Sequence, residues 1–204
     1  MPNSLTSAIA SLSNSHAEVR ASAAAEIYRQ GRAQAERTVL TWFQNAELAG
    51  LLLSPAPIVT VGLAVARETF EQIRKANGEP ELAQVPPDQD AEEFELHFGV
   101  GVQLDVLTSK DPAGSGAIAR YLSRFGEGIQ QVEFYCRDVN RATTILHEHF
   151  GVTAIYGEVR PGAGGTRINF FLVSVPEAAG GGSKILIELY ESPDKPLSRQ
   201  GKTT

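Results

Sequence analysis

The sequence contains a single cysteine, Cys136, among 204 residues. One cysteine cannot form a disulfide within the chain, so we expect a protein of the reducing cytoplasm. Cys136 alternates with Val132 and Phe134 in an apolar segment. Because free cysteine is among the most buried residue types, this pattern favours a buried strand residue over a catalytic nucleophile.

Long apolar runs and clusters of basic residues are also missing. The apolar runs are far too short to cross a bilayer, including residues 49–53, which Ser54 and Pro55 follow. The first residues lack the basic-then-apolar pattern of a secretory signal. The formal net charge is -6, whereas proteins that bind nucleic acids usually present a basic face. We therefore expect no membrane and no nucleic-acid partner.

The first 54 residues have a helical pattern. Ser15 and Glu18 have the spacing of a capping box at the start of a helix. Apolar residues then recur every four positions, at Val19, Ala23 and Ile27. Gly31 is predicted to end this helix, because glycine is the preferred residue just past a helix C-terminus.

A second helix is predicted after Gly31, with an apolar stripe formed by Ala35, Val39, Leu40 and Phe43. The two helices would form a hairpin over residues 1–54, separate from a second domain over residues 55–204. The hairpin could cover that domain or form the contact of a homodimer. Nothing in it suggests a catalytic site.

Residues 55–204 contain a pattern that occurs twice. In each copy a short apolar strand leads into a helix, and a late strand reads apolar, Gln or Glu, then Leu. The segments are 58–65, 69–76 and 102–104 in the first copy, and 129–136, 140–149 and 187–189 in the second. A duplicated βαβββ unit predicts an α+β fold, because one unit leaves a sheet face open and two units close a core. The modules would span about 57–110 and 127–191.

The pattern also predicts the elements between these segments. Residues 93–98 alternate polar and apolar side chains, which indicates a half-buried strand. Residues 79–90 contain three prolines and form a loop, and residues 118–124 form a short helix. A glycine-rich turn is expected at 180–182 and a frayed polar tail from Ser192.

Four segments of this region carry a resemblance to a known family. They read VGLAV at 61–65, YLSRFGEGIQQV at 121–132, RPGAGG at 160–165 and LIEL at 186–189. Together they resemble the vicinal oxygen chelate superfamily, which includes glyoxalases, bleomycin resistance proteins and dioxygenases, and within it the methylmalonyl-CoA epimerases. The resemblance implies that paired modules form a cupped sheet, and that the loop at 160–165 borders an acyl-CoA site.

The resemblance also implies a metal site. In metal-dependent members each module supplies one ligand from its first strand and one from its last, and the metal polarises a substrate carbonyl or enolate oxygen. By position, Gln103 and Glu188 fall on two of these ligands, whereas Thr60 and Gln131 stand where histidines are expected. A hydroxyl and an amide bind transition metals far less well than imidazole. We therefore expect no cofactor, with a divalent metal at Gln103 and Glu188 as the alternative.

Strand alternation sends one set of side chains to a common, mostly polar sheet face. This set is Thr60, Gly62, Gln103, Asp105, Gln131, Glu133, Tyr135, Glu188 and Tyr190. In a cupped sheet this face lines the ligand cavity, whereas in an open sheet it would be plain solvent surface. We predict the following ligand-binding residues: Thr60, Gln103, Asp105, Gln131, Tyr135 and Tyr190.

Three carboxyl groups are the candidate catalytic residues: Glu95, Glu133 and Glu188. Glu133 and Glu188 lie on the polar face, and Glu133 could serve as a replacement metal ligand. Glu95 and His97 share one side of a strand whose counterpart in the epimerases contributes a carboxylate base. Such a pair could abstract a proton if burial raised the carboxyl pKa. A solvated pair on an edge strand is the alternative.

Three hypotheses for the function follow. In the first, the protein binds a small carbonyl- or carboxylate-bearing molecule in the cup, such as an acyl-CoA, without metal catalysis. In the second, it is an active lyase or isomerase that holds a metal loosely and abstracts a proton next to a carbonyl. In the third, the cup has no ligand and the N-terminal hairpin mediates interactions.

Overall fold

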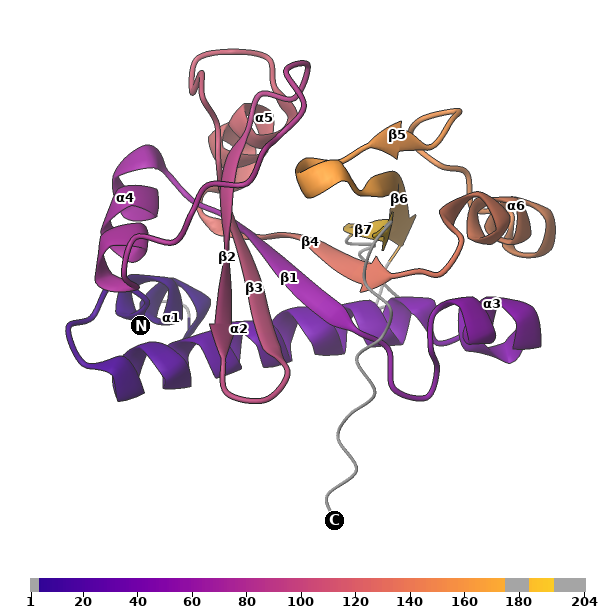
Figure 1. The fold of residues 1–204 in the computed structure, drawn as a ribbon, viewed down its shortest axis with the longest axis horizontal. Helices are drawn as coiled ribbons and strands as arrows, with labels where there is room; N and C mark the ends of the chain where they lie inside the picture. Colours follow the sequence, from indigo (N-terminus) through magenta and orange to yellow (C-terminus); the bar gives the residue numbers. More distant parts are fainter. Residues whose placement is uncertain (1–3, 175–183, 193–204) are drawn as a thin grey trace.

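The computed structural model describes residues 4–174 and 184–192, and it confirms the predicted α+β fold with its cupped sheet (Figure 1). The predicted turn at 180–182 and the tail after Ser192 lie outside the described residues. The strands are β1 (Val59–Ala64), β2 (Glu92–Phe98), β3 (Val102–Thr108), β4 (Gly128–Tyr135), β5 (Arg160–Pro161), β6 (Arg167–Ser174) and β7 (Lys184–Glu191). They form one mixed sheet in the order β2-β3-β1-β4-β7-β6-β5.

The helices are α1 (Ser4–Ser11), α2 (Ala17–Val39), α3 (Ala46–Leu51), α4 (Arg67–Ala76), α5 (Ala117–Phe125) and α6 (Val139–Phe150). Two single-turn 3-10 helices, η1 (Trp42–Gln44) and η2 (Ala163–Gly165), complete the described elements. Within the described ranges, no helix has the length and apolar character needed to span a membrane.

The two modules pair within one chain. The first comprises β1, α4, β2 and β3, and the second comprises β4, α6, β5, β6 and β7. In each module the first strand runs parallel to the last, β1 beside β3 and β4 beside β7. An antiparallel pairing of β1 with β4 joins the modules, with Val61 opposite Val132. The first strands of both modules therefore form the centre of the sheet.

The first module has three strands, and a loop takes the place of the fourth. This loop, residues 77–91, is called the bridging loop. Its Ala83 N–H donates to the Glu93 carbonyl on the outer edge of β2 (2.9 Å). Pro80, Pro86 and Pro87 lack the N–H groups that a regular strand needs, so the pairing does not continue.

The bridging loop also reaches the second module. The Gly164 N–H donates to the Gln84 carbonyl (3.2 Å), and the Gln89 amide donates to the Pro161 carbonyl (3.3 Å). Asp88 forms an ion pair with Arg160. Since β2 and β5 are the two edges of the sheet, the loop connects one edge to the other.

The N-terminal helices differ from the prediction in their boundaries. N-terminal helices are present as predicted and form a hairpin, but its arms are α1 and α2, because the two predicted helices are one continuous helix, α2, which runs through Gly31 to Val39. The predicted end at Gly31 is therefore wrong. Gly31 is buried where α2 crosses the sheet, and a Cβ there would lie 2.7 Å from Val61 Cγ1. The glycine allows the helix to approach β1 closely.

The predicted capping box at the start of α2 is also wrong. The N-cap residue is His16, one position beyond Ser15, and its side chain makes no capping hydrogen bond. Instead the Asn14 side chain accepts a hydrogen bond from the His16 N–H (2.9 Å) in the turn between α1 and α2. The turn thus closes through Asn14, which the spacing of Ser15 and Glu18 did not indicate.

One apolar core joins the helices to the sheet. Ala24, Ile27 and Ala35 of α2 are fully buried against the sheet face that carries Val61 and Leu63. Figure 1 shows α2 along the lower side of the view, running past strands of both modules. The division of the chain at residue 54 remains a prediction, but both sides of it contribute to the same core.

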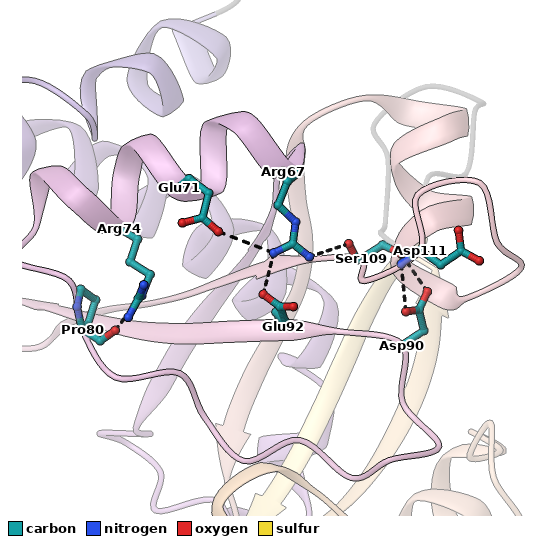
Figure 2. Close-up of polar contacts among 8 residues, drawn as sticks. All are labelled: Arg67, Glu71, Arg74, Pro80, Asp90, Glu92, Ser109 and Asp111. Carbon is teal, nitrogen blue, oxygen red and sulfur yellow. Dashed lines mark hydrogen bonds and ion pairs between the residues drawn. The ribbon is translucent and has the colours of Figure 1, made fainter.

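Arg67, at the start of α4, connects that helix to two strands (Figure 2). Its guanidinium donates to Glu92 Oε2 (2.5 Å) on β2 and to the Ser109 carbonyl (3.1 Å) beyond the end of β3. Glu71 lies 3.7 Å from the same group. These contacts hold the end of the bridging loop that leads into β2.

The two ends of the bridging loop are fixed by further polar contacts shown in Figure 2. At the start, Arg74 Nε donates to the Pro80 carbonyl (2.9 Å). At the end, Asp90 accepts hydrogen bonds from Ser109 Oγ (2.8 Å) and from the Asp111 N–H (3.2 Å). The loop is therefore anchored to α4 and to the segment after β3.

A pair of matched substitutions tests the role of Gly31. Alanine favours a helix over glycine by about 1 kcal/mol, so Gly50→Ala, with no atom near the new methyl group, should stabilise the protein slightly. Gly31→Ala should instead destabilise it by about 1 kcal/mol, because overpacking against Val61 costs about 1–3 kcal/mol. Urea unfolding of both variants measures the difference, and equal stabilisation by the two would contradict the close approach.

The Arg67 contacts give a second prediction. Arg67→Met should lower the free energy of unfolding by about 1–2 kcal/mol, since it removes charged hydrogen bonds and leaves the buried Ser109 carbonyl without this donor. Arg29→Met is the control and should leave the stability nearly unchanged, because the Arg29 side chain is 68% exposed and a solvent-exposed ion pair such as the one with Glu26 contributes little. Limited proteolysis should also become faster within residues 77–91. Unchanged stability and cleavage would show that the loop is held by other contacts.

Candidate functional site

The predicted polar residues lie on one concave face of the sheet, which is called the cup. Pairing places Gly62 of β1 between Asp105 of β3 and Gln131 of β4. Thr60 lies opposite Glu133, and Glu133 lies beside Glu188 of β7. The remaining predicted residues on this face are Gln103, Tyr135, Tyr190 and Glu95. The structure thus brings all of them to one face, while their roles remain predictions.

The second module supplies a hydrogen-bonded group of three side chains. The Gln131 amide nitrogen donates to Glu133 Oε1 (3.0 Å) and to Glu188 Oε2 (2.8 Å). Gln131 and Glu188 are buried, with 6% and 8% of their surfaces exposed. The amide lies over Gly62, where any Cβ would be 2.4 Å from Gln131 Cγ. Glycine at this position therefore makes room for the group.

Two further contacts lie next to this group. Thr60 Oγ1 donates to Gln103 Oε1 (3.2 Å) across β1 and β3. The rings of Tyr135 and Tyr190 pack edge to face, with centroids 5.7 Å apart. Burial, followed by the negative charge of Glu133, raises the pKa of Tyr190, so its hydroxyl stays protonated and can donate a hydrogen bond.

The carboxyl groups of the cup have raised pKa values. Burial raises the pKa of Glu133 to about 7, and burial together with the charge of Glu95 raises that of Glu93 to about 7. Burial also raises the pKa of Asp105 and Glu188 well above the ordinary value, with neighbouring carboxylates adding to the effect. Protonated and ionised carboxyl groups can therefore coexist here near neutral pH.

Glu95 and His97 lie at the rim of the cup rather than inside it. Their side chains are 66% and 58% exposed, and His97 Nε2 is 2.9 Å from Glu95 Oε2. They belong to the edge strand β2, as a solvated pair would. The catalytic role of Glu95 remains a prediction, and the exposure of its side chain to solvent does not favour that role. Glu93 lies deeper on the same side of β2, and strand alternation was the signal that could have identified it.

The cup has a wall that the sequence did not indicate. Ile118 of α5 packs with Ala64 and Leu107 on the concave side, and Tyr121 and Leu122 pack against them. Tyr121 donates its hydroxyl hydrogen to the Ile129 carbonyl (2.8 Å). The short helix was predicted, but its position over the cup depends on contacts between distant residues.

Cys136 is buried, as its alternation predicted. Burial raises the pKa of its thiol to about 12, so the nucleophilic thiolate is scarce at neutral pH.

The side chains of the cup do not fit a bound transition metal. Within the described residues, no group of three or more His, Cys, Asp or Glu side chains is arranged to hold a metal ion. Gln131 turns its amide N–H groups toward Glu133 and Glu188, and an N–H donor is not a metal ligand. Thr60 and Gln103 are hydrogen-bonded to each other. The correspondence of these positions to the family's metal ligands remains a prediction.

Two surface grooves of about 420 and 410 Å³ lie away from the cup. The first is between α1 and α2, and the second is between α6 and β6. Neither is lined by any of the predicted site residues.

Comparison with solved structures agrees with this architecture. Methylmalonyl-CoA epimerase from Mycobacterium tuberculosis matches with 32% identity and a TM-score of 0.50, over 65% of this chain and 85% of its own. A Streptomyces coelicolor methylmalonyl-CoA epimerase bound to 2-nitronate-propionyl-CoA matches at 22% identity and a TM-score of 0.51, over 68% and 99%. A hypothetical protein from Bacillus halodurans C-125 matches at 22% and 0.52, over 67% and 94%.

No protein-family model and no curated protein sequence matches the chain. The match at 32% identity nevertheless covers most of the Mycobacterium tuberculosis enzyme, and the order of strands follows the paired modules expected from the sequence. The chain belongs to the methylmalonyl-CoA epimerase-like proteins of the vicinal oxygen chelate superfamily.

Proposed function

We propose that this protein binds a small carbonyl-bearing molecule in the cup, such as the acyl group of an acyl-CoA, without a bound metal. The observation that carries the proposal is the hydrogen-bonded group of Gln131, Glu133 and Glu188, in which Gln131 and Glu188 are buried. A carboxyl group with a pKa near 7 is protonated in part at neutral pH, and a protonated carboxyl donates a hydrogen bond to a carbonyl oxygen. The similarity to an epimerase of methylmalonyl-CoA supports an acyl-CoA.

A carboxylate-bearing ligand fits the cup less well than a carbonyl. Glu133 already lies close enough to Asp105 and Glu188 for its negative charge to raise the pKa of both. A further negative charge would meet the same repulsion. A carbonyl oxygen carries no net charge and accepts hydrogen bonds from the protonated carboxyls and from the Tyr190 hydroxyl.

The raised pKa values also favour a second candidate function, proton transfer next to a carbonyl, as in a lyase or isomerase. An acid or base works best when its pKa lies near the working pH. Glu133, with a pKa of about 7, can accept a proton from a carbon next to the carbonyl. Glu188 in its protonated form could then donate to the carbonyl oxygen as negative charge develops there. In this candidate function the proton transfer takes place without a bound metal.

Homodimer formation and a cytoplasmic location remain part of the proposal, and the sequence supports them as described above. The α1–α2 hairpin contributes to the sheet core, so it serves the fold of this chain whether or not it also contacts a second copy.

Ligand binding is tested with propanoyl-CoA and with free CoA, which lacks the propanoyl group and its carbonyl. Propanoyl-CoA should raise the melting temperature more than CoA, because a ligand that binds only the folded protein stabilises it. Glu188→Met should weaken binding of propanoyl-CoA about tenfold, the loss expected for one hydrogen bond of about 1.4 kcal/mol. Glu148→Met on the exposed face of α6 is the control and should bind as the native protein does.

Two results would contradict this proposal. Equal stabilisation by CoA and propanoyl-CoA would mean that the cup does not bind the carbonyl. Uptake of one equivalent of zinc, cobalt or nickel by protein purified without chelator, lost in Glu188→Ala, would establish the metal-dependent enzyme instead. Exchange of the α-hydrogen of propanoyl-CoA with deuterium, followed by NMR, distinguishes proton transfer from binding alone.

The raised pKa values of Glu93 and Glu133 also predict how stability depends on pH. The folded protein keeps protons on Glu93 and Glu133 up to a pKa of about 7, whereas the unfolded chain releases them near 4.5. The folded state thus binds more protons between these values, so the free energy of unfolding should fall as pH rises from about 5 to about 8. Glu133→Gln should make this fall shallower, and Glu148→Gln should not. Urea unfolding across this range measures both, and a rise in stability toward pH 8 would refute the assignment.

A further inference from the structure

The half of the cup formed by the first module contains a carboxyl group that lacks a partner. Asp105 is 8% exposed, and its Oδ1 atom is buried without a hydrogen bond among the described residues. Pairing places it between Gly62 and Glu95, on the same face as Glu133 and Glu188. The second module differs, because the Gln131 amide supplies N–H donors to both of its carboxyl groups.

No cation of the described residues compensates this half of the cup. Neither Arg nor Lys lies within ion-pair distance of Glu93, Asp105, Glu133 or Glu188 in the part of the chain that the structure describes. Lys110, beyond the end of β3, acts on Glu93 only at longer range. A buried carboxyl oxygen without a donor is unfavourable by about 1–3 kcal/mol. A donor brought by the ligand would remove that cost.

We infer that the ligand of the cup carries a positively charged nitrogen, whose N–H groups donate to Asp105, in addition to the carbonyl held by the second module. This inference rests on the proposed function and adds a second recognition element to it. The second module already contains such a contact from an uncharged donor, since the NH₂ group of Gln131 lies between two carboxyl groups. An ammonium group would make the same contact with Asp105, and a hydrogen bond from a charged donor is stronger than one from a neutral amide.

Other occupants fit this position less well. A metal ion needs several ligands converging on one point, and the described residues offer no such group. A carboxylate would add to the repulsion that Glu93 and Glu133 already exert on the ionised form of Asp105. A neutral hydroxyl could donate only one hydrogen bond, and that bond would be weaker than one from a charged N–H group. A positively charged nitrogen brings several N–H donors and adds no negative charge.

Three methyl ketones of matched length test the inference: 4-aminobutan-2-one, 4-hydroxybutan-2-one and levulinate. They carry the same carbonyl and end in an ammonium, a hydroxyl and a carboxylate. Calorimetry should show the amine binding about tenfold or more tightly than the hydroxyl compound, a difference of about 1.4 kcal/mol. Binding of the amine should release protons, because a nearby cation favours the ionised form of a carboxyl. Titrations in two buffers with different heats of ionisation measure this release.

Variants locate the effect. Asp105→Asn should reduce the preference for the amine over the hydroxyl compound to about one and abolish the proton release. Glu148→Gln removes one exposed carboxylate outside the cup and should leave both unchanged. If Asp105→Asn does not fold, the affinity ratio and the proton release of the native protein still decide the question.

The outcomes separate this inference from the proposed function. Equal binding of amine and hydroxyl compound, or tightest binding of levulinate, overturns the charged nitrogen while the carbonyl site stands. If none of the three compounds binds, both the charged nitrogen and the carbonyl site are overturned for ketones of this size. Amine preference without proton release, or one that persists in Asp105→Asn, overturns the assignment to Asp105.

Discussion

The antiparallel pairing of β1 with β4 is the constraint on which the rest of the structure depends. Every residue of β1 is buried. Helices cover one face of the strand, and side chains of the neighbouring strands, such as Gln131, cover the other. The pairing brings Asp105 of the first module and Glu133 of the second to either side of a single strand. Without it the carboxyl groups of the two modules would lie in separate half-sites, and the effect of Glu133 on the pKa of Asp105 would disappear.

The sequence predicted the modules because the repeat depends on local patterns. A short apolar strand, an amphipathic helix and a late strand with Gln103 or Glu188 are each visible within a few residues. Gly31 shows where local reasoning fails, because a glycine that ends a helix and a glycine that permits a close contact look the same in the sequence. Only the crossing of α2 over Val61, thirty positions further on, distinguishes them.

In the cup, too, local patterns predicted one part of the arrangement and contacts between distant residues decide the rest. Strand alternation placed Thr60, Asp105 and Glu188 on a common face, because side-chain direction in a strand follows from its period of two. Alternation does not give the direction of an amide or the partner of a carboxyl oxygen. That Gln131 presents N–H groups to two carboxyls, while Asp105 has no donor, depends on distances between strands of different modules.

Because both modules belong to one chain, the two walls of the cup need not be alike. Two identical subunits would present the same residues twice around a symmetry axis, and a bound molecule could enter in either of two equivalent orientations. Here one wall carries Asp105 and Glu93, and the other carries Gln131 and Glu188. A bound molecule therefore meets unlike surroundings at its two ends, so only one of its two orientations forms the full set of contacts.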